Sequence, residues 1–257
     1  MNNTDKIRFF KPILTACFSV LLTSCITINA APLNYKETKN LSLNASSLKQ
    51  LRVDATAGFL IIQGTSGETI VVTADIEAYS EEFELSLKKE GENAVLVADA
   101  NKIDKWNWSG NSPKIDLTIT LPKHLSLKIK DGSGSIKIGN TSNNIYLNDG
   151  SGSIEISHIV GNIEIDDGSG STKINHVTGN ILIDDGSGSI TIENIEGTVT
   201  VEDGSGGMNL SDITGLVSID DGSGSINVKR LNNGLTLINE GSGSLNMTDV
   251  EGPVTIE

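Results

Sequence analysis

Cysteine, proline and aromatic residues are scarce in this chain of 257 residues. Only Cys17 and Cys25 occur, both near the N-terminus, so the rest of the chain can form no disulfide and use no thiol chemistry. Aromatic residues make up 4% of the composition and hydrophobic residues 37%, which predicts a core of aliphatic side chains. Beyond the N-terminal segment, no apolar run is long enough to cross a membrane as a helix.

Basic residues are scarce in the second half of the chain. Residues 131–257 carry 19 acidic and 4 basic side chains, and the whole chain has a formal net charge of −14. Nucleic-acid binding needs clustered Lys and Arg, so the composition argues against such a partner. The sequence also lacks G-x-S-x-G, H-E-x-x-H and a phosphate-binding glycine loop. We therefore expect a protein that is not an enzyme.

The N-terminal segment has the pattern of a secretory signal. The basic start MNNTDKIRFFK precedes the short apolar stretch PILTACFSVLLTSC. LTSC, which ends at Cys25, resembles a bacterial lipobox, and this predicts a signal peptide over residues 1–24 and a lipid on Cys25. Cleavage after Ala30 or Ala31 is the alternative. The first route predicts a lipid-anchored envelope protein, and the second a soluble periplasmic or secreted protein.

Glycine, by contrast, is abundant and occurs in a repeat. DGSGS or a close copy of it begins at Asp131, Asp149, Asp167, Asp185, Asp203 and Asp221, and Glu240 closes the series. The spacing is constant as far as Asp221, and the last interval is one position longer. Within each repeat the pattern G-x-Φ-x-Φ, where Φ is apolar, occurs twice, as in GSIEI and GNIEI. The alternation predicts strands with one buried face, and the Gly and Ser clusters predict turns.

This repeat predicts an all-β fold: a single-stranded, right-handed β-solenoid, similar to a β-helix or β-roll, with 18-residue rungs. Seven rungs cover residues 131–257. One inward column consists of Ile136, Ile154, Thr172, Ile190, Met208, Ile226 and Leu245, in which Thr172 is the exception. The extra residue of the 19-residue rung lies either in the turn at residues 232–234 or in a bulge near Ile238.

Residues 33–130 also have strand patterns, but these are irregular, as in LRVDAT, GFLIIQG and TIVVTADIEA. We expect this region to form a β-layer that caps the first rung, because the unpaired strand edges of an uncovered rung could pair with strands of other molecules. The stretch LSLKIK runs directly into the first DGSGS, so we expect it to join the solenoid.

Several of these features together resemble one known family. The secretory signal, the irregular β start, the entry LPKHLSLKIKDGSGSIKI and the repeated G-S/N-I-x-I are similar to the bacterial family of proposed adhesins with β-strand repeats, a domain of unknown function. The similarity extends over about residues 45–257. It implies an extracytoplasmic β-solenoid with an adhesin-like binding or scaffolding role and no catalytic residues. The partner would be a protein or glycan of the envelope or cell surface.

The acidic corners raise the question of metal binding. The Asp that leads each DGSG can accept hydrogen bonds from the turn's own N–H groups, which needs no ligand. The residue before it is acidic in four rungs, and Ca²⁺ favours such oxygen-rich turns. The alternative function is therefore a divalent-cation-binding, calcium-stabilised module, although the GGxGxD order of calcium β-rolls is absent. Its candidate ligands are Asp149, Asp166, Asp167, Asp184, Asp185, Asp203, Asp220 and Asp221.

Two further pairs are candidate sites. His158 and His176 share a column and are predicted to stack on the opposite edge, without a cysteine or carboxylate cluster to complete a metal site. Trp106 and Trp108 in KWNWSG face the same way in an extended segment. They either pack on the cap or form an exposed aromatic platform for a glycan or another partner. A carbohydrate-active enzyme is a distant alternative, because the acids repeat along the chain instead of gathering at one site.

Overall fold

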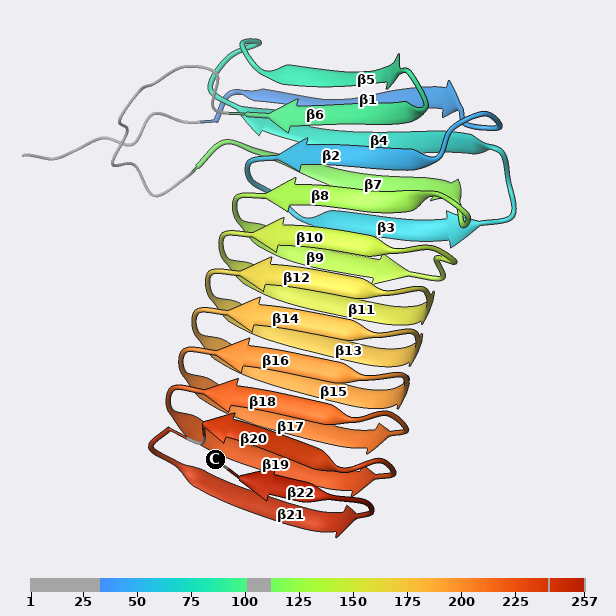
Figure 1. Ribbon diagram of the computed structural model, residues 1–257. Helices are drawn as coiled ribbons and strands as arrows, with labels where there is room; N and C mark the ends of the chain where they lie inside the picture. The colour runs from blue at the N-terminus through green and yellow to red at the C-terminus, as the bar shows by residue number, and fades with distance from the viewer. Residues whose placement is uncertain (1–32, 101–111, 240, 257) are drawn as a thin grey trace, which may run out of the picture.

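The structure, a computed structural model, describes residues 33–100, 112–239 and 241–256, and its regular elements there are all β-strands. The strands form two sheets of eleven, which enclose one aliphatic core (Figure 1). In these ranges we find no helix with the length and apolar character of a membrane span.

Both sheets run from the N-terminal end of the stack to its C-terminal end. In that spatial order, sheet A consists of β1 (Tyr35–Asn44), β4 (Thr69–Ala78), β7 (Lys114–Pro122), β3 (Leu60–Thr65), β9 (Gly134–Gly139), β11 (Gly152–Val160), β13 (Gly170–Thr178), β15 (Gly188–Glu196), β17 (Gly206–Ile213), β19 (Gly224–Leu231) and β21 (Ser244–Val250). Sheet B consists of β5 (Glu84–Glu90), β6 (Asn93–Asp99), β2 (Gln50–Ala55), β8 (Ser126–Asp131), β10 (Ile145–Asp149), β12 (Ile163–Asp167), β14 (Ile181–Asp185), β16 (Val199–Asp203), β18 (Val217–Asp221), β20 (Leu235–Asn239) and β22 (Val254–Ile256).

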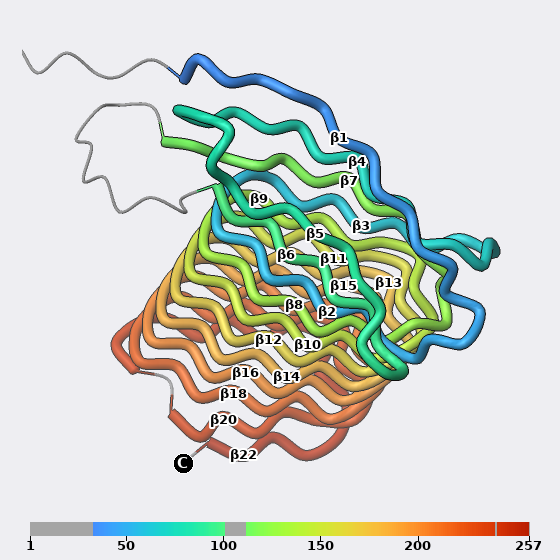
Figure 2. The backbone as a smooth tube through the Cα atoms, turned by 90° about the horizontal axis from the view of Figure 1, so that it is seen from above, coloured from blue at the N-terminus to red at the C-terminus, as the bar shows by residue number. Residues whose placement is uncertain are grey.

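From β8 onward the chain alternates between the sheets, and each strand pairs in parallel with the equivalent strand of the next rung. Equivalent positions of successive repeats lie side by side, so that Ile154 is opposite Ile136 on one side and Thr172 on the other. In Figure 1 the chain runs leftward in sheet B, in front, and rightward in sheet A, behind, as it descends; Figure 2 gives the same arrangement from above. This winding is right-handed. The predicted β-solenoid is therefore confirmed.

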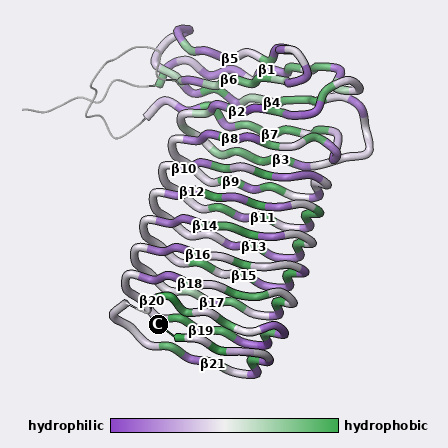
Figure 3. The backbone as a smooth tube through the Cα atoms, viewed as in Figure 1, coloured by the Kyte–Doolittle hydropathy of each residue, from purple (hydrophilic) through white to green (hydrophobic). Residues whose placement is uncertain are grey.

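Apolar and polar residues alternate along the strands, as the hydropathy colouring of the backbone in Figure 3 shows. The apolar side chains of this alternation are the buried ones. Ile190 and Ile192 on β15 are both completely buried. Thr172 occupies the same inward column, and its hydroxyl group is buried without a hydrogen-bond partner among the described residues. On the edge strand β21, Met247 is 44% exposed because no further strand of sheet A covers it.

The 19-residue rung contains a β-bulge. Ile219 of β18 pairs with Leu237 of β20, whereas the next residue, Asp220, pairs with Asn239. Ile238 is left without a partner in the ladder and is 46% exposed. Of the two positions that the sequence leaves open for the extra residue, the strand near Ile238 is correct.

The N-terminal region covers the end of the stack by extending both sheets. As predicted, LSLKIK joins the solenoid as β8. Strands β2 and β3 form a rung on top of β8 and β9, and β6 and β7 form the next rung outward, all in parallel. Strands β5, β4 and β1 then close the stack with antiparallel pairing. The cap therefore continues the two sheets instead of forming a separate layer.

Candidate functional site

Each DGSG segment forms the corner where the chain passes from sheet B to sheet A. In the fourth unit, Oδ1 of Asp185 accepts a hydrogen bond from the backbone N–H of Ser187 at 3.0 Å. Asp167, Asp203 and Asp221 each accept the same bond from the residue two positions later, at 3.2, 3.1 and 3.0 Å. These are Asx turns, as the sequence predicts, and they account for an Asp at the head of the repeat.

The glycines of the corner are required by close contact with the preceding rung. Gly188 has a φ of 152°, and a Cβ atom there would lie 1.6 Å from the carbonyl oxygen of Gly170. The Gly188 N–H group donates in the other direction, to the carbonyl oxygen of Ser205 at 2.9 Å. Stacked corners can approach this closely only without side chains.

The leading aspartates turn their side chains into the core. All of them are at most 5% exposed: Asp131, Asp149, Asp167, Asp185, Asp203 and Asp221. In each of these side chains, Oδ2 is buried and has no hydrogen-bond partner among the described residues. Because the strands are in register, the carboxyl groups form a ladder inside the solenoid, with steps of about 4.8 Å. We call these six residues the inner ladder.

Burial raises the pKa of each carboxyl group in the inner ladder, because the charged form is disfavoured in an apolar core. The pKa of Asp131 rises to about 7, and repulsion from Asp149 adds to the effect of burial. The pKa values of Asp149 and Asp185 rise to about 6. Asp131, Asp149 and Asp185 can therefore take up protons close to neutral pH.

The acids that precede the inner ladder point the other way. Asp166, Asp184, Glu202 and Asp220 pair in register along sheet B and lie on its outer face. We call these four residues the outer acidic column. Asn148 in the preceding rung donates a hydrogen bond to Asp166 at 2.6 Å.

The structure thus separates the predicted metal ligands into two sets. Asp149, Asp167, Asp185, Asp203 and Asp221 lie in the core, and Asp166, Asp184 and Asp220 lie on the surface. Alternate residues of a strand face opposite sides, so the two sets cannot converge on one ion. In the described part of the chain, no group of three His, Cys, Asp or Glu side chains could hold a metal ion.

The opposite edge has a column of residues in the left-handed backbone conformation. Its members, with φ between 53° and 59°, are Asn140, His158, His176, Asn194, Asp212, Arg230 and Asp249. The rings of His158 and His176 stack as predicted, with centroids 5.0 Å apart and an interplanar angle of 4°. Sequence reasoning did not find the full column. The recurrence of Asn, His and Asp at this position of the repeat is the available signal, since these residues tolerate positive φ.

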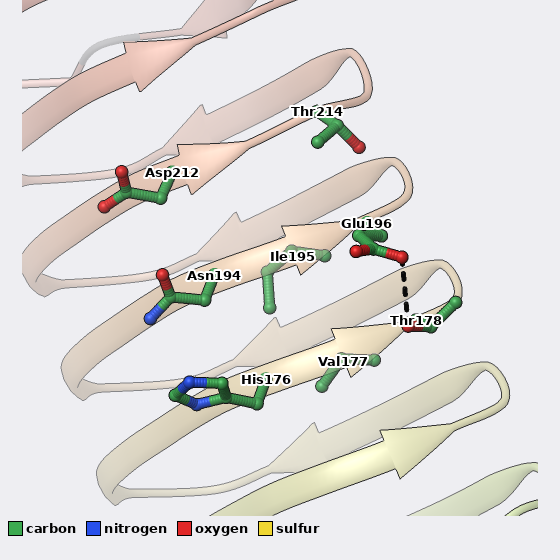
Figure 4. A pocket seen from close by; sticks show the side chains of 8 residues that line it. All are labelled: His176, Val177, Thr178, Asn194, Ile195, Glu196, Asp212 and Thr214. Atoms are coloured by element: carbon green, nitrogen blue, oxygen red, sulfur yellow. Dashed lines mark hydrogen bonds between the residues drawn. The ribbon is translucent and has the colours of Figure 1, made fainter.

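A shallow groove of about 350 Å³ runs beside this column, and Figure 4 shows His176, Asn194 and Asp212 lying along it in successive rungs. Asp212 is a carboxylate in the histidine column, but it forms an ion pair with Arg230, whose Nε donates at 2.6 Å. The Arg230 guanidinium lowers the pKa of Asp212 by hydrogen bonding to it. The negative charge of Asp212 is therefore already compensated by Arg230 in the next rung.

A second polar ladder, also missed from the sequence, supports the turns before three strands of sheet B, which are β12, β14 and β16. The side-chain oxygens of Asn144 and Asn162 accept hydrogen bonds at 2.9 Å from the backbone N–H groups of Asn162 and Asn180. Asn180 continues the ladder to the N–H of Thr198 at 3.0 Å. These asparagines have a structural role.

The remaining predicted site residues cannot be placed. Trp106 and Trp108, the expected aromatic pair, lie outside the described residues, and so do Cys25 and both alternative cleavage positions.

Comparison with known families identifies the repeat. The profile of the Toastrack DUF4097 family matches residues 81–247, which is more than half of the chain. The chain belongs to the Toastrack family. The resemblance predicted from its sequence is thereby confirmed, and it is a family of unknown function. No curated protein matches this Toastrack chain.

Several solved structures are similar to this chain. A proposed adhesin from Bacteroides fragilis NCTC 9343 is 17% identical to this Toastrack chain, with a TM-score of 0.56 over 83% of this chain and 98% of that one. A proposed adhesin from Parabacteroides distasonis ATCC 8503 is 12% identical, with a TM-score of 0.41 over 82% and 97%. A proposed cell adhesion protein from Clostridium sporogenes ATCC 15579 is also 12% identical, with a TM-score of 0.34 over 83% and 99%. The likeness to the first shows a shared fold.

Proposed function

We propose that this chain is a non-enzymatic, adhesin-like module that binds or scaffolds partners outside the cytoplasm, in the cell envelope or at the surface. Membership of the Toastrack family supports this proposal, and so does the shared fold with the proposed adhesin of Bacteroides fragilis. The signal-like N-terminal sequence supports the location.

The repeated register of the outer surface is the observation that carries the proposal. Asp166, Asp184 and Glu202 present carboxylates from adjacent parallel strands, at steps of about 4.8 Å. A partner that is itself repetitive, such as a surface polymer or a neighbouring envelope protein, can contact several rungs at once. Each contact is weak, but several held on one rigid frame give avidity.

Binding to isolated envelopes tests the proposal. The purified mature protein is immobilised, and retention of envelope vesicles from the source cells is measured by surface plasmon resonance. We expect specific retention that falls when Asp166, Asp184 and Glu202 are changed together to Asn, Asn and Gln. The matched control changes Glu193 and Glu196 of β15, in sheet A, to Gln. Absence of retention, or equal losses in both variants, contradicts the proposal.

We also propose that Cys25 carries a lipid that holds the protein at the membrane. The LTSC sequence supports this, whereas the unusually apolar ITINA that follows Cys25 favours the competing outcome, cleavage after Ala30 or Ala31. The membrane would then be reached through the anchor alone.

Divalent cation binding is a second proposal, and the outer acidic column favours it. Asp166 and Asp184 face solvent from neighbouring strands, so two carboxylate groups and water can share one Ca²⁺. The inner ladder would not contribute, because its side chains are enclosed in the core. Such sites would stabilise the stack by relieving repulsion between rungs.

A further inference from the structure

Three basic side chains lie close together on the outer face of sheet B, near the N-terminal end of this acidic protein. Arg52 lies on β2 directly beside Lys128 on β8, and Lys130 is two residues further along β8. All three side chains are exposed, and none forms an ion pair with another described residue. Asp54 lies opposite Lys130, so Arg52 and Lys128 carry the excess positive charge. Further along the outward column of Lys128 lies an acid, Glu164, so the cluster contrasts with the rest of this face.

The cations border a groove of about 380 Å³ whose floor is partly apolar. Val95 and Val97 of β6 are half-buried at one side, and the half-buried ring of Tyr146 on β10 lies at the other. The Lys128 Nζ atom is 5.3 Å from the centre of the Tyr146 ring. A cationic rim around an aliphatic and aromatic floor suits a ligand that is both anionic and partly apolar.

The backbone beneath the groove is fully engaged in the sheet. Strand β2 pairs with β6 and β8, and β8 pairs with β2 and β10 (Figure 2). A peptide therefore cannot bind here by adding a strand to a free edge, which is the usual route to tight binding of an extended peptide on a sheet. Recognition must come from side chains reaching outward across several strands.

We propose that this groove binds an acidic glycan, a short segment of sugars that carry carboxylates, such as uronic acids. The carboxylates would pair with Arg52 and Lys128, and a sugar ring would lie against Tyr146. This inference rests on the proposed binding function and names a ligand class for this groove, which is a binding surface separate from the outer acidic column. An anionic membrane fits less well, because Glu164 and Asp166 on the same face would be repelled by it.

Titration calorimetry of the mature protein with trigalacturonic acid and with its methyl ester tests the proposal. We expect the free acid to bind at least about tenfold more tightly than the neutral ester, since charge-assisted contacts are lost with the ester. Arg52→Gln with Lys128→Gln should weaken binding by at least about tenfold. Lys173→Gln, an exposed change on β13 in sheet A, should leave it unchanged. Unchanged melting temperatures show that the variants are folded.

Variants of Tyr146 distinguish the contribution of ring stacking to binding from the contribution of charge. Tyr146→Ala should weaken binding of the trisaccharide, and Tyr146→Phe should retain it, because the ring face is preserved. Equal binding of acid and ester, no binding of the acid, or binding that survives the Arg52 and Lys128 changes overturns the proposal. Tighter binding to polyglutamate or to phosphatidylglycerol vesicles than to trigalacturonate also overturns it. If any of these results is obtained but the protein still retains envelope vesicles, the acidic glycan is not the ligand and the proposed binding function is still supported.

Discussion

At the scale of single residues, a leading aspartate such as Asp185 stabilises its turn by a hydrogen bond and, when charged, destabilises the core in which it is buried. One oxygen of Asp185 completes the Asx turn with Ser187, while the other is buried without a partner among the described residues. A buried charge without a partner is unfavourable, so the fold favours the protonated form. The turn chemistry and the proton uptake of the inner ladder therefore come from the same side chain.

The inner ladder predicts a protein that gains stability in mild acid. The pKa of Asp185 is about 3.9 in an unfolded chain and about 6 in the fold. A raised folded pKa means that the contribution is fully present below about pH 4 and is lost as the pH rises through 6. Asp167 and Asp203, the ladder groups that face Asp185 from adjacent rungs, shift in the same direction. We expect the melting temperature to fall by several degrees between pH 4.5 and pH 7.5.

Asp185→Asn should flatten this pH dependence, because its side chain keeps an oxygen for the Ser187 N–H group and has no charge to bury. Asp184→Asn, on the outer face of the same strand, is the matched control and should leave the slope nearly unchanged. Asp212, whose pKa is lowered by Arg230, loses its contribution only at more acidic pH, below the range tested. A melting temperature that rises from pH 4.5 to 7.5 contradicts the burial of the ladder.

Corner glycines offer a sharper test at the same scale. Gly188→Ala should destabilise the fold by more than about 2 kcal/mol, because its Cβ atom would clash with the Gly170 carbonyl group. Gly207→Ala is the control, since no atom lies within 4 Å of a Cβ atom built there and its φ is not in the restricted range. The measurement is urea unfolding followed by circular dichroism. Equal effects of the two changes would contradict the close stacking of corners.

At the scale of strands, each inward residue is covered by the same position in the rungs above and below. Ile192 of β15 lies between Ile174 and Leu210 and is completely buried. Ile192→Asp should therefore destabilise several rungs together, by more than about 3 kcal/mol. Thr191→Asp, one residue away and facing outward, should be tolerated. Thermal melts compare the two variants, and an unchanged melting temperature for Ile192→Asp would refute the register.

The outer acidic column gives a second prediction at this scale. Carboxylates about 4.8 Å apart repel one another by about 1 kcal/mol per pair in water, so calcium should raise the melting temperature above that in chelator with matched sodium chloride. With true sites the gain grows with the logarithm of concentration, to about 2.7 kcal/mol at a hundred times the dissociation constant. Asp166→Asn with Asp184→Asn should reduce the gain, and Glu193→Gln on β15 should not. Identical melts would exclude calcium sites on this column.

At the scale of the whole molecule, the proposed anchor determines where the solenoid acts. Cys25→Ser should move the protein from the membrane fraction to the soluble periplasmic fraction, because the lipidated residue is lost. Immunoblotting of fractions checks this, with Ser24→Ala as a control that leaves the modified thiol in place. A wild-type protein that is already soluble, with its N-terminus at Ala31 or Pro32, would refute the anchor.

The solenoid was predictable because its constant period fixes the register and brings the same inward positions together in every rung. The Asx turn and the stacked histidines follow from the same spacing. The burial of the leading aspartates was not predicted, although strand alternation places Asp184 and Asp185 on opposite faces. The groove at Arg52 could not be inferred, because β2 and β8 are widely separated in the chain and no repeat links them.

The insertion of β2 and β3 between later strands has a consequence for the order in which the chain can fold. This rung lies between β8 and β6, both of which follow β2 in the chain, so neither side of β2 can pair until those segments exist. The later rungs, by contrast, each need only the rung that precedes them. Closing the long loops is entropically slow, and adding a rung to an existing stack is fast. The parallel stack would thus grow past β2 and β3 only after β8 and β9 have been synthesised, even though β6 and β7 can pair with β2 and β3 earlier.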